Sequence, residues 1–107
     1  LEEADIHINV RPQADGGLIT VNKFDGEMLP LLQQYVDSLQ ENLFIVFHSY
    51  GSHFYYKERY PEEFAKFQPA NATEVEYKNK DQLINAYDNS ILYTDYFLHS
   101  LIGICPP

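Results

Sequence analysis

The hydrophobic pattern changes abruptly near the middle of the chain, where a continuous apolar run is followed by a short polar loop. The run covers residues 43–47, and the loop at 48–53 holds two imidazoles and two serine hydroxyls. Uninterrupted apolar residues are typical of a strand that is buried on both faces. Ligands bind beyond the carboxyl ends of such strands. The pattern therefore predicts a buried strand at 43–47 and candidate chemistry in the loop that follows it.

Three other segments have the spacing of helices. The first is predicted at 30–39, with Asp25 as its N-cap. A short helix is predicted to begin at Pro61, and the longest to cover 79–103, where glycine and proline end the pattern. The apolar positions of this longest helix are Leu83, Ile84, Tyr87, Ile91, Leu98, Leu101 and Ile102.

The first twenty residues are weakly patterned. Ile6, Ile8 and Val10 alternate with polar residues, which predicts one or two weak strands in this region. A lone buried strand leaves its backbone groups unpaired, so a strand at 43–47 needs neighbours. We expect those neighbours to lie outside this sequence. The predicted fold is therefore α/β: residues 1–107 are a fragment of a doubly wound domain, with about three helices around one strong buried strand.

Composition and charge narrow the classes of function. The 107 residues are 45% hydrophobic, which suffices for one small core. A net charge of −9 without a cluster of basic residues disfavours binding to nucleic acid. No apolar stretch approaches the ~20 residues of a membrane helix, so we expect a soluble chain without a targeting signal. The single cysteine, Cys105, cannot form an internal disulfide and leaves the compartment open.

Two segments carry a resemblance to a known family. They are FHSYGSHFYYKERYPEEFAKFQP at 47–69 and DQLINAYDNSILYTDYFL at 81–98, preceded by the looser VNKFDGEMLPLL at 21–32. In order and spacing they resemble a central portion of the catalytic domain of phosphoethanolamine transferases, lipid A-modifying members of the sulfatase and alkaline-phosphatase-like superfamily. The resemblance implies a zinc enzyme of the inner membrane with a periplasmic catalytic domain. It would move phosphoethanolamine from phosphatidylethanolamine to lipid A through a covalent threonine intermediate.

Other parts of the family pattern have no match. No Asp-His dipeptide occurs, and Thr20, Thr73 and Thr94 do not lie in a context like that of the family's nucleophile. The end at Pro107 is expected to reflect a truncated gene, a frameshift or a trimmed form. We therefore expect residues 1–107 to be a partial sulfatase-like catalytic domain that is inactive alone and binds no zinc tightly. Its partner would be the rest of the catalytic domain.

The loop after the predicted strand supplies the candidate site. His53 matches a family histidine that reaches the transferred phosphoethanolamine or a second zinc, and an imidazole suits either role. His48 matches a second family histidine, which binds substrate or braces the loop. Arg59 is suited to a substrate phosphate or, alternatively, to an ion pair with Glu62 or Glu63. Without the resemblance, a loop histidine is more often simply solvated.

Two other functions stay open from the sequence. A sulfate-ester or phosphate-ester hydrolase fragment would share the histidine loop but release its product to water. A non-catalytic module would form homo-oligomers through its unpaired strand edge and apolar helix faces. The polar residues of the longest helix are expected to form a solvated face and helix-packing contacts rather than a ligand site. They are Asp88, Asn89, Tyr93 and Asp95.

Overall fold

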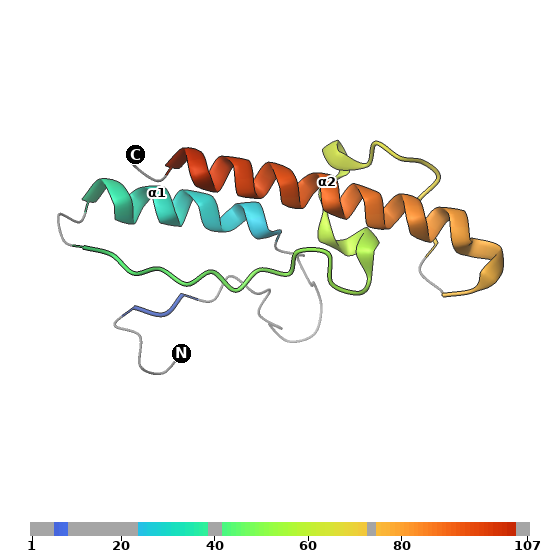
Figure 1. Ribbon diagram of the computed structural model, residues 1–107, viewed down its shortest axis with the longest axis horizontal. Helices are drawn as coiled ribbons and strands as arrows, with labels where there is room; N and C mark the ends of the chain where they lie inside the picture. Colours follow the sequence, from blue (N-terminus) through green and yellow to red (C-terminus); the bar gives the residue numbers. More distant parts are fainter. Residues whose placement is uncertain (1–5, 9–23, 39–41, 73–74, 105–107) are drawn as a thin grey trace, which may run out of the picture.

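The computed structural model describes residues 6–8, 24–38, 42–72 and 75–104 (Figure 1). Two α-helices dominate this part of the chain: α1, Leu29–Ser38, and α2, Lys80–Ile104. The same residues contain four 3-10 helices: η1 at Asp25–Met28, η2 at Tyr56–Arg59, η3 at Glu62–Phe64 and η4 at Tyr77–Asn79. Because η1 leads directly into α1 and η4 into α2, each α-helix begins with a tightened first turn.

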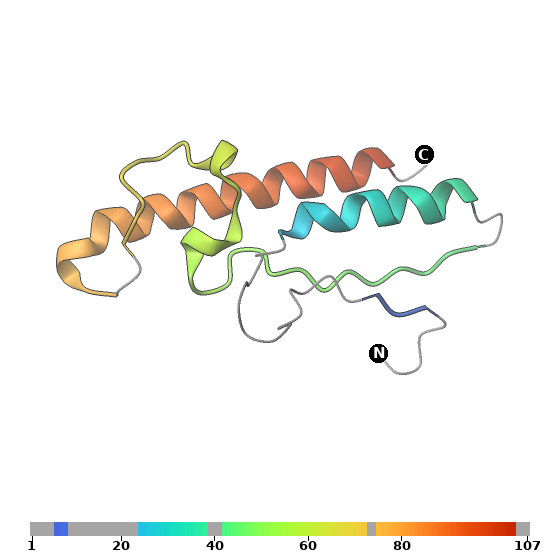
Figure 2. The same cartoon turned by 180° about the vertical axis from the view of Figure 1, so that it is seen from behind.

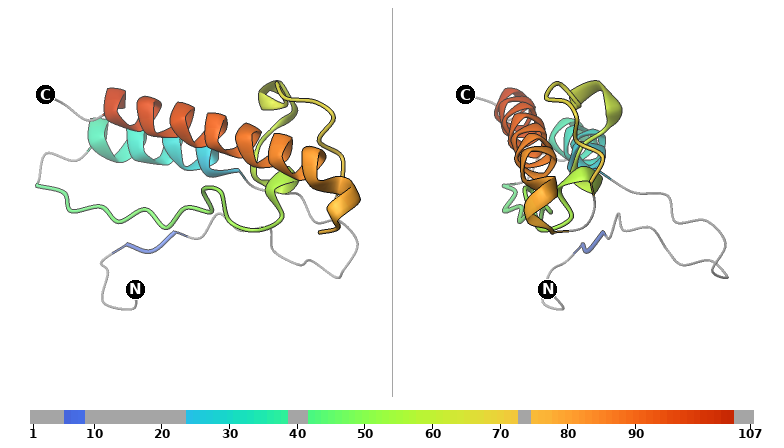
Figure 3. Two further views of the ribbon diagram at one scale, coloured as in Figure 1. Left: turned by 45° about the vertical axis from the view of Figure 1, so that its right-hand side comes forward. Right: turned by 90° about the vertical axis from the view of Figure 1, so that its right-hand side faces the viewer.

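The two α-helices lie side by side and run in the same direction, as Figures 1 and 2 show from opposite sides. An extended segment at 42–50 returns along α1 in the opposite direction. The following residues pass beside the middle of α2, where η2 and η3 both contact this helix (Figure 3). The radius of gyration is 16.4 Å, against about 13 Å for a compact domain of this size. The arrangement is therefore open, with α2 as its spine.

The predicted α/β fold is wrong for the described residues, which contain helices and no strand. The segment at 43–47 is extended, as predicted, but most of it is exposed rather than buried, and Phe44 is 93% exposed. Phe47 alone is partly covered, and its ring meets that of Phe97 edge-on at a centroid distance of 6.4 Å. An apolar segment becomes a strand only where another backbone pairs with it. No described segment does so here.

Two of the predicted helices are confirmed and the third is reduced to a single turn. The helices predicted at 30–39 and 79–103 are α1 and α2. Pro61 precedes only the 3-10 turn η3. Asp25 is not the N-cap of the first helix, because Phe24 takes that place without a side-chain bond. The weak strands were predicted in a region that lies mostly outside the described residues, and residues 6–8 form no strand.

The face that α2 buries differs from the apolar face that predicted this helix. The buried residues are Ala86, Asn89, Ser90, Tyr93 and Phe97. Ile84, Ile91 and Leu98 are exposed, as is Ile102 at 73%. At about 100° per residue, these isoleucines and Leu98 form a second stripe more than a third of a turn away from the buried one. Despite this stripe, neither α2 nor any other described helix is long and apolar enough to cross a membrane.

Asn89 is fully buried, so of the solvated face and helix-packing contacts expected for this group of polar residues, it belongs to the packing contacts. Its Oδ1 accepts a hydrogen bond from the Phe67 N–H at 2.8 Å, and its Nδ2 donates to the Phe67 carbonyl at 3.0 Å. Nδ2 also donates to the Tyr60 hydroxyl at 3.2 Å. A buried amide is tolerated when its donors and acceptor are all bonded. These bonds fix the backbone at Phe67 against α2.

A second long-range contact joins η1 to α2. The Gly26 N–H donates to the Tyr93 hydroxyl at 2.8 Å, and a Cβ at residue 26 would lie 2.5 Å from that oxygen. Only glycine permits this approach. Burial raises the pKa of the Tyr93 hydroxyl above its usual value, and the charges of Asp25 and Glu27 add to the rise, whereas the Gly26 N–H opposes it. The hydroxyl is therefore protonated at neutral pH.

Replacing Asn89 tests its role in holding the loop on α2. We expect Asn89→Ala to lower the free energy of unfolding by about 3 kcal/mol, because it leaves the Phe67 backbone groups and the Tyr60 hydroxyl without their partner. Asn85→Ala is the matched control, since Asn85 makes one exposed bond to the Pro69 carbonyl and should cost under about 1 kcal/mol. Urea unfolding measures both. Equal losses would contradict the role of Asn89.

The exposed apolar segment predicts self-association. We expect the chain to associate as its concentration rises, because an extended apolar edge offers unpaired backbone to a second copy. Phe44→Lys should weaken this association and leave the free energy of unfolding of the monomer unchanged within about 0.5 kcal/mol. Tyr77→Lys is the matched control, because Tyr77 is 89% exposed elsewhere on the chain. Sedimentation velocity decides, and a wild-type monomer at all concentrations would refute the expectation.

Candidate functional site

Residues 48–55, here called the His loop, follow the extended segment and reverse the chain in a tight turn. The His53 N–H donates to the Tyr50 carbonyl at 3.1 Å, and Gly51 has a positive φ of 56°. Tyr55 ends the loop in the left-handed region, with φ 69° and ψ 56°. That conformation is uncommon for a bulky residue. Two left-handed positions therefore shape the backbone that presents His53.

A buried carboxylate holds the first half of the His loop. Asp25 is 7% exposed, and its two oxygens accept hydrogen bonds from different amides. Oδ1 accepts from the Tyr50 N–H at 2.9 Å, and Oδ2 accepts from the Gly51 N–H at 2.8 Å. Hydrogen bonds to an ionised acceptor are stronger than neutral ones. The first residue of η1 thus binds the turn directly.

Arg59 holds the second half of the His loop. Its Nε donates to the carbonyls of His53 at 3.3 Å and Phe54 at 3.2 Å, and its Nη2 donates to the Phe54 carbonyl at 2.8 Å. The guanidinium carbon also lies 4.4 Å from the centroid of the Tyr50 ring. Within the described residues Arg59 makes no ion pair with Glu62 or Glu63, so that alternative is wrong.

The His48 and His53 side chains are exposed, and neither forms a hydrogen bond within the described part of the chain. The fold brings the backbone of His53 against the Arg59 guanidinium and leaves the imidazole open to solvent. No three His, Cys, Asp or Glu side chains among the described residues lie close enough to hold a metal ion. These residues do not fit a zinc centre, which needs three or four protein ligands. His53 can supply one.

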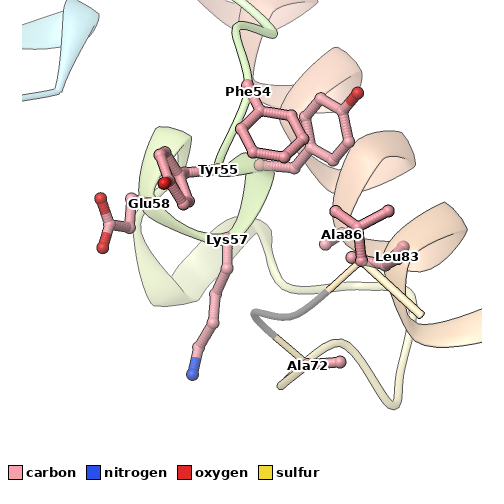
Figure 4. A pocket seen from close by; sticks show the side chains of 9 residues that line it. Phe54, Tyr55, Lys57, Glu58, Ala72, Leu83 and Ala86 are labelled. Atoms are coloured by element: carbon pink, nitrogen blue, oxygen red, sulfur yellow. The ribbon is translucent and has the colours of Figure 1, made fainter. Parts of the chain in front are cut away.

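A small pocket lies beside the His loop, between η2 and α2 (Figure 4). In Figure 4, Leu83 and Ala86 face the pocket from α2, whereas Lys57 extends outward from η2. The volume is about 30 Å³. That volume is about the space of one water molecule and is too small for a substrate headgroup.

A wider hollow of about 420 Å³ opens between η1, η3 and α2. Glu27 and Glu63 line it together with the ring of Tyr93, and His53 does not reach it. Because two carboxylates repel an anion, this hollow is unsuited to a phosphate group. The open side of the His loop is therefore the better candidate for phosphate chemistry.

Comparison with known proteins identifies the family. A family model described as Sulfatase matches residues 4–103, so the chain belongs to the sulfatase family. More particularly, it is related to lipid A phosphoethanolamine transferases, as the residue pattern predicted. It is 37% identical over 83 residues to phosphoethanolamine transferase EptA of Escherichia coli strain K12. These aligned residues are 76% of this chain and 15% of EptA. The EptA of Salmonella typhimurium is 39% identical over the same length and the same fractions of the two chains.

A second kind of transferase is similar as well. The Kdo(2)-lipid A phosphoethanolamine 7''-transferase of Escherichia coli strain K12 is 40% identical over 75 residues, which is 63% of this chain and 13% of that protein. The chain thus spans about 15% of the length of the curated relatives it matches. No solved structure matches it.

The sequence did not reveal that Asp25 belongs to the site. An aspartate just before an amphipathic stripe is typical of an N-cap, and this explanation concealed its long-range contact. The available signal was the glycine that follows Asp25, because a glycine at this position permits the close approach of η1 to the Tyr93 hydroxyl. Nothing in the local pattern indicated that the carboxylate binds a turn 25 residues away.

Two glycines provide a test of the loop conformation. We expect Gly51→Ala to lower the free energy of unfolding by about 1 kcal/mol through its positive φ alone, because an added Cβ meets nothing within 4 Å. Gly103→Ala in α2 is the matched control, since its Cβ also meets nothing but its backbone is helical. It should stabilise by about 0.5 kcal/mol. Thermal unfolding measures both variants. Changes in the free energy of unfolding with the same sign would contradict the loop geometry.

Proposed function

We propose that this chain is part of the catalytic domain of a phosphoethanolamine transferase that moves phosphoethanolamine from phosphatidylethanolamine to lipid A or another envelope glycan. The observation that carries the proposal is the similarity to several transferases of that name, at 37–40% identity for those described above. The family resemblance extends the proposal to an inner-membrane enzyme with a periplasmic catalytic domain. The chain alone is inactive, because no threonine here resembles the nucleophile.

In this proposal His53 contacts the transferred group. Its imidazole stands on a braced loop and has no hydrogen-bond partner within the described residues, so it is available to a ligand. A neutral imidazole donates one hydrogen bond to a phosphoryl oxygen, and a protonated one also stabilises the negative charge that grows during transfer. His48 and Arg59 also bind substrate in this proposal. Arg59 has N–H groups beyond those bonded to the His53 and Phe54 carbonyls, and these suit a second phosphoryl oxygen.

Zinc belongs to the proposal only for the complete enzyme, where the family resemblance implies it. Such an ion would supply Lewis-acid chemistry and activate the nucleophile. The described residues hold no cluster that could bind it, so His53 contributes at most one ligand from this part of the chain. Hydrogen bonding to the phosphoryl group is the role that its surroundings support.

A sulfate-ester or phosphate-ester hydrolase is the alternative enzyme, and it would use the same loop with water as acceptor. A self-associating module without catalysis is the alternative of another class, favoured by the exposed segment at 43–47. Binding of phosphoethanolamine by the His loop separates the two enzymes from the module, and transfer to a lipid A acceptor, measured on the complete enzyme, separates the transferase from the hydrolase.

The first test uses the 107-residue chain and O-phosphoethanolamine as the probe. We expect weak binding, seen as a concentration-dependent shift of the phosphorus resonance of the probe. His53→Ala should weaken it about tenfold, which corresponds to loss of one hydrogen bond to a charged group. His99→Ala, on the exposed side of α2, is the matched control.

Transfer from labelled phosphatidylethanolamine to lipid A should be undetectable with the chain alone. Equal probe binding by wild type and His53→Ala would remove His53 from the proposal. Absence of binding by the wild-type chain would contradict the assignment of the His loop as a phosphoethanolamine site.

A further inference from the structure

We infer that Asp25 is a positioning residue for the His loop: its buried carboxylate sets the turn from which His53 reaches the phosphoryl group. This inference rests on the proposed function and adds to it a residue that does not touch the substrate. Asp25 lies 28 positions before His53 in the sequence, and the fold joins them through the backbone of Tyr50 and Gly51.

The geometry shows why one carboxylate controls this turn. Oδ1 and Oδ2 take one amide each from two consecutive residues, so rotation of the turn breaks both bonds together. The second of these residues is Gly51, whose positive φ directs the following backbone. The turn then closes through the bond from the His53 N–H to the Tyr50 carbonyl. The carboxylate therefore acts on the residues that aim His53.

The two halves of the loop are held by opposite charges acting on opposite backbone groups. Asp25 accepts from N–H groups at 50 and 51, whereas Arg59 donates to carbonyls at 53 and 54. The Arg59 guanidinium also lies over the Tyr50 ring, which links the two supports. Asp25 is buried and Arg59 only partly so, and the Asp25 support is anchored in η1, which bonds to α2 through Gly26. Asp25 therefore connects the His loop, through η1, to α2.

The experiment combines amide hydrogen exchange with binding of O-phosphoethanolamine, both on the full 107-residue chain. In the wild type we expect slow exchange at Tyr50 and Gly51 although both residues are partly or largely exposed. Asp25→Asn should accelerate exchange of both amides more than tenfold, because the asparagine NH₂ group is itself a donor and cannot accept a hydrogen bond from the Tyr50 or the Gly51 N–H. Exchange at Phe67, whose amide is held by Asn89, should not change.

Binding separates positioning from general stability. Asp25→Asn should weaken probe binding about as much as His53→Ala, and the double variant should bind no more weakly than His53→Ala alone. This non-additivity is expected when one residue acts through the other. Asp37→Asn is the matched control, because the one bond that Asp37 accepts within the described ranges is an exposed bond from the Gln33 side chain on α1. It should change neither exchange nor binding.

Each outcome decides the inference. Additive losses in the double variant, or unchanged exchange at Tyr50 and Gly51 in Asp25→Asn, would overturn it. If Asp25→Asn does not fold, fast exchange of these amides in the wild type overturns it and slow exchange supports it, with Asp25→Glu as the folded replacement. If the wild-type chain binds no probe, the proposed function fails and the positioning role falls with it, while the exchange data still report whether the carboxylate holds the turn.

Discussion

The buried side-chain amide of Asn89 is the interaction on which the arrangement around α2 depends. It forms hydrogen bonds with both the N–H and the carbonyl of Phe67, as a neighbouring strand would. These bonds satisfy backbone groups that would otherwise need another partner. With Phe67 fixed, the short segment back to the Tyr60 ring has little freedom, and Tyr60 is bonded to the same amide. The turns η2 and η3 are thereby held on α2. Arg59 belongs to η2, so the second half of the His loop is placed through this contact.

The existence of the helices was predictable from the sequence, but the way in which they pack was not. Apolar residues spaced three or four positions apart identify a helix, whichever face of the helix they lie on. It does not tell which stripe packs within the chain. On α2 strongly apolar residues such as Ile91 and Ile102 are exposed, whereas smaller residues such as Ala86 and Ser90 are buried. The buried stripe mixes such small residues with the large rings of Tyr93 and Phe97, so neither size nor hydropathy along the helix identifies it.

The extended segment and its loop were predicted with mixed success for a related reason. The conformation at 43–47 follows from its β-branched and aromatic residues, whereas burial depends on a partner that the local sequence does not encode. The histidine loop was identified from its polar residues and family pattern, but the roles of Asp25 and Arg59 in holding its backbone were not. Asp25 acts across the fold, and Arg59 binds carbonyl groups, which leave no mark in a sequence.

The spacing of these contacts along the chain bears on the order in which the structure forms. The bonds from Asp25 to the loop span 25 and 26 residues, and that from Asn89 to Phe67 spans 22. The bond between Gly26 and Tyr93 spans 67 residues. Closing the longer loop from a flexible chain costs about 0.8 kcal/mol more than closing one of 26 residues. The contacts of the His loop with η1, and of the Phe67 segment with α2, therefore close at a lower cost in chain entropy than the contact of Gly26 with Tyr93, which is one of those that join the two ends of the described chain.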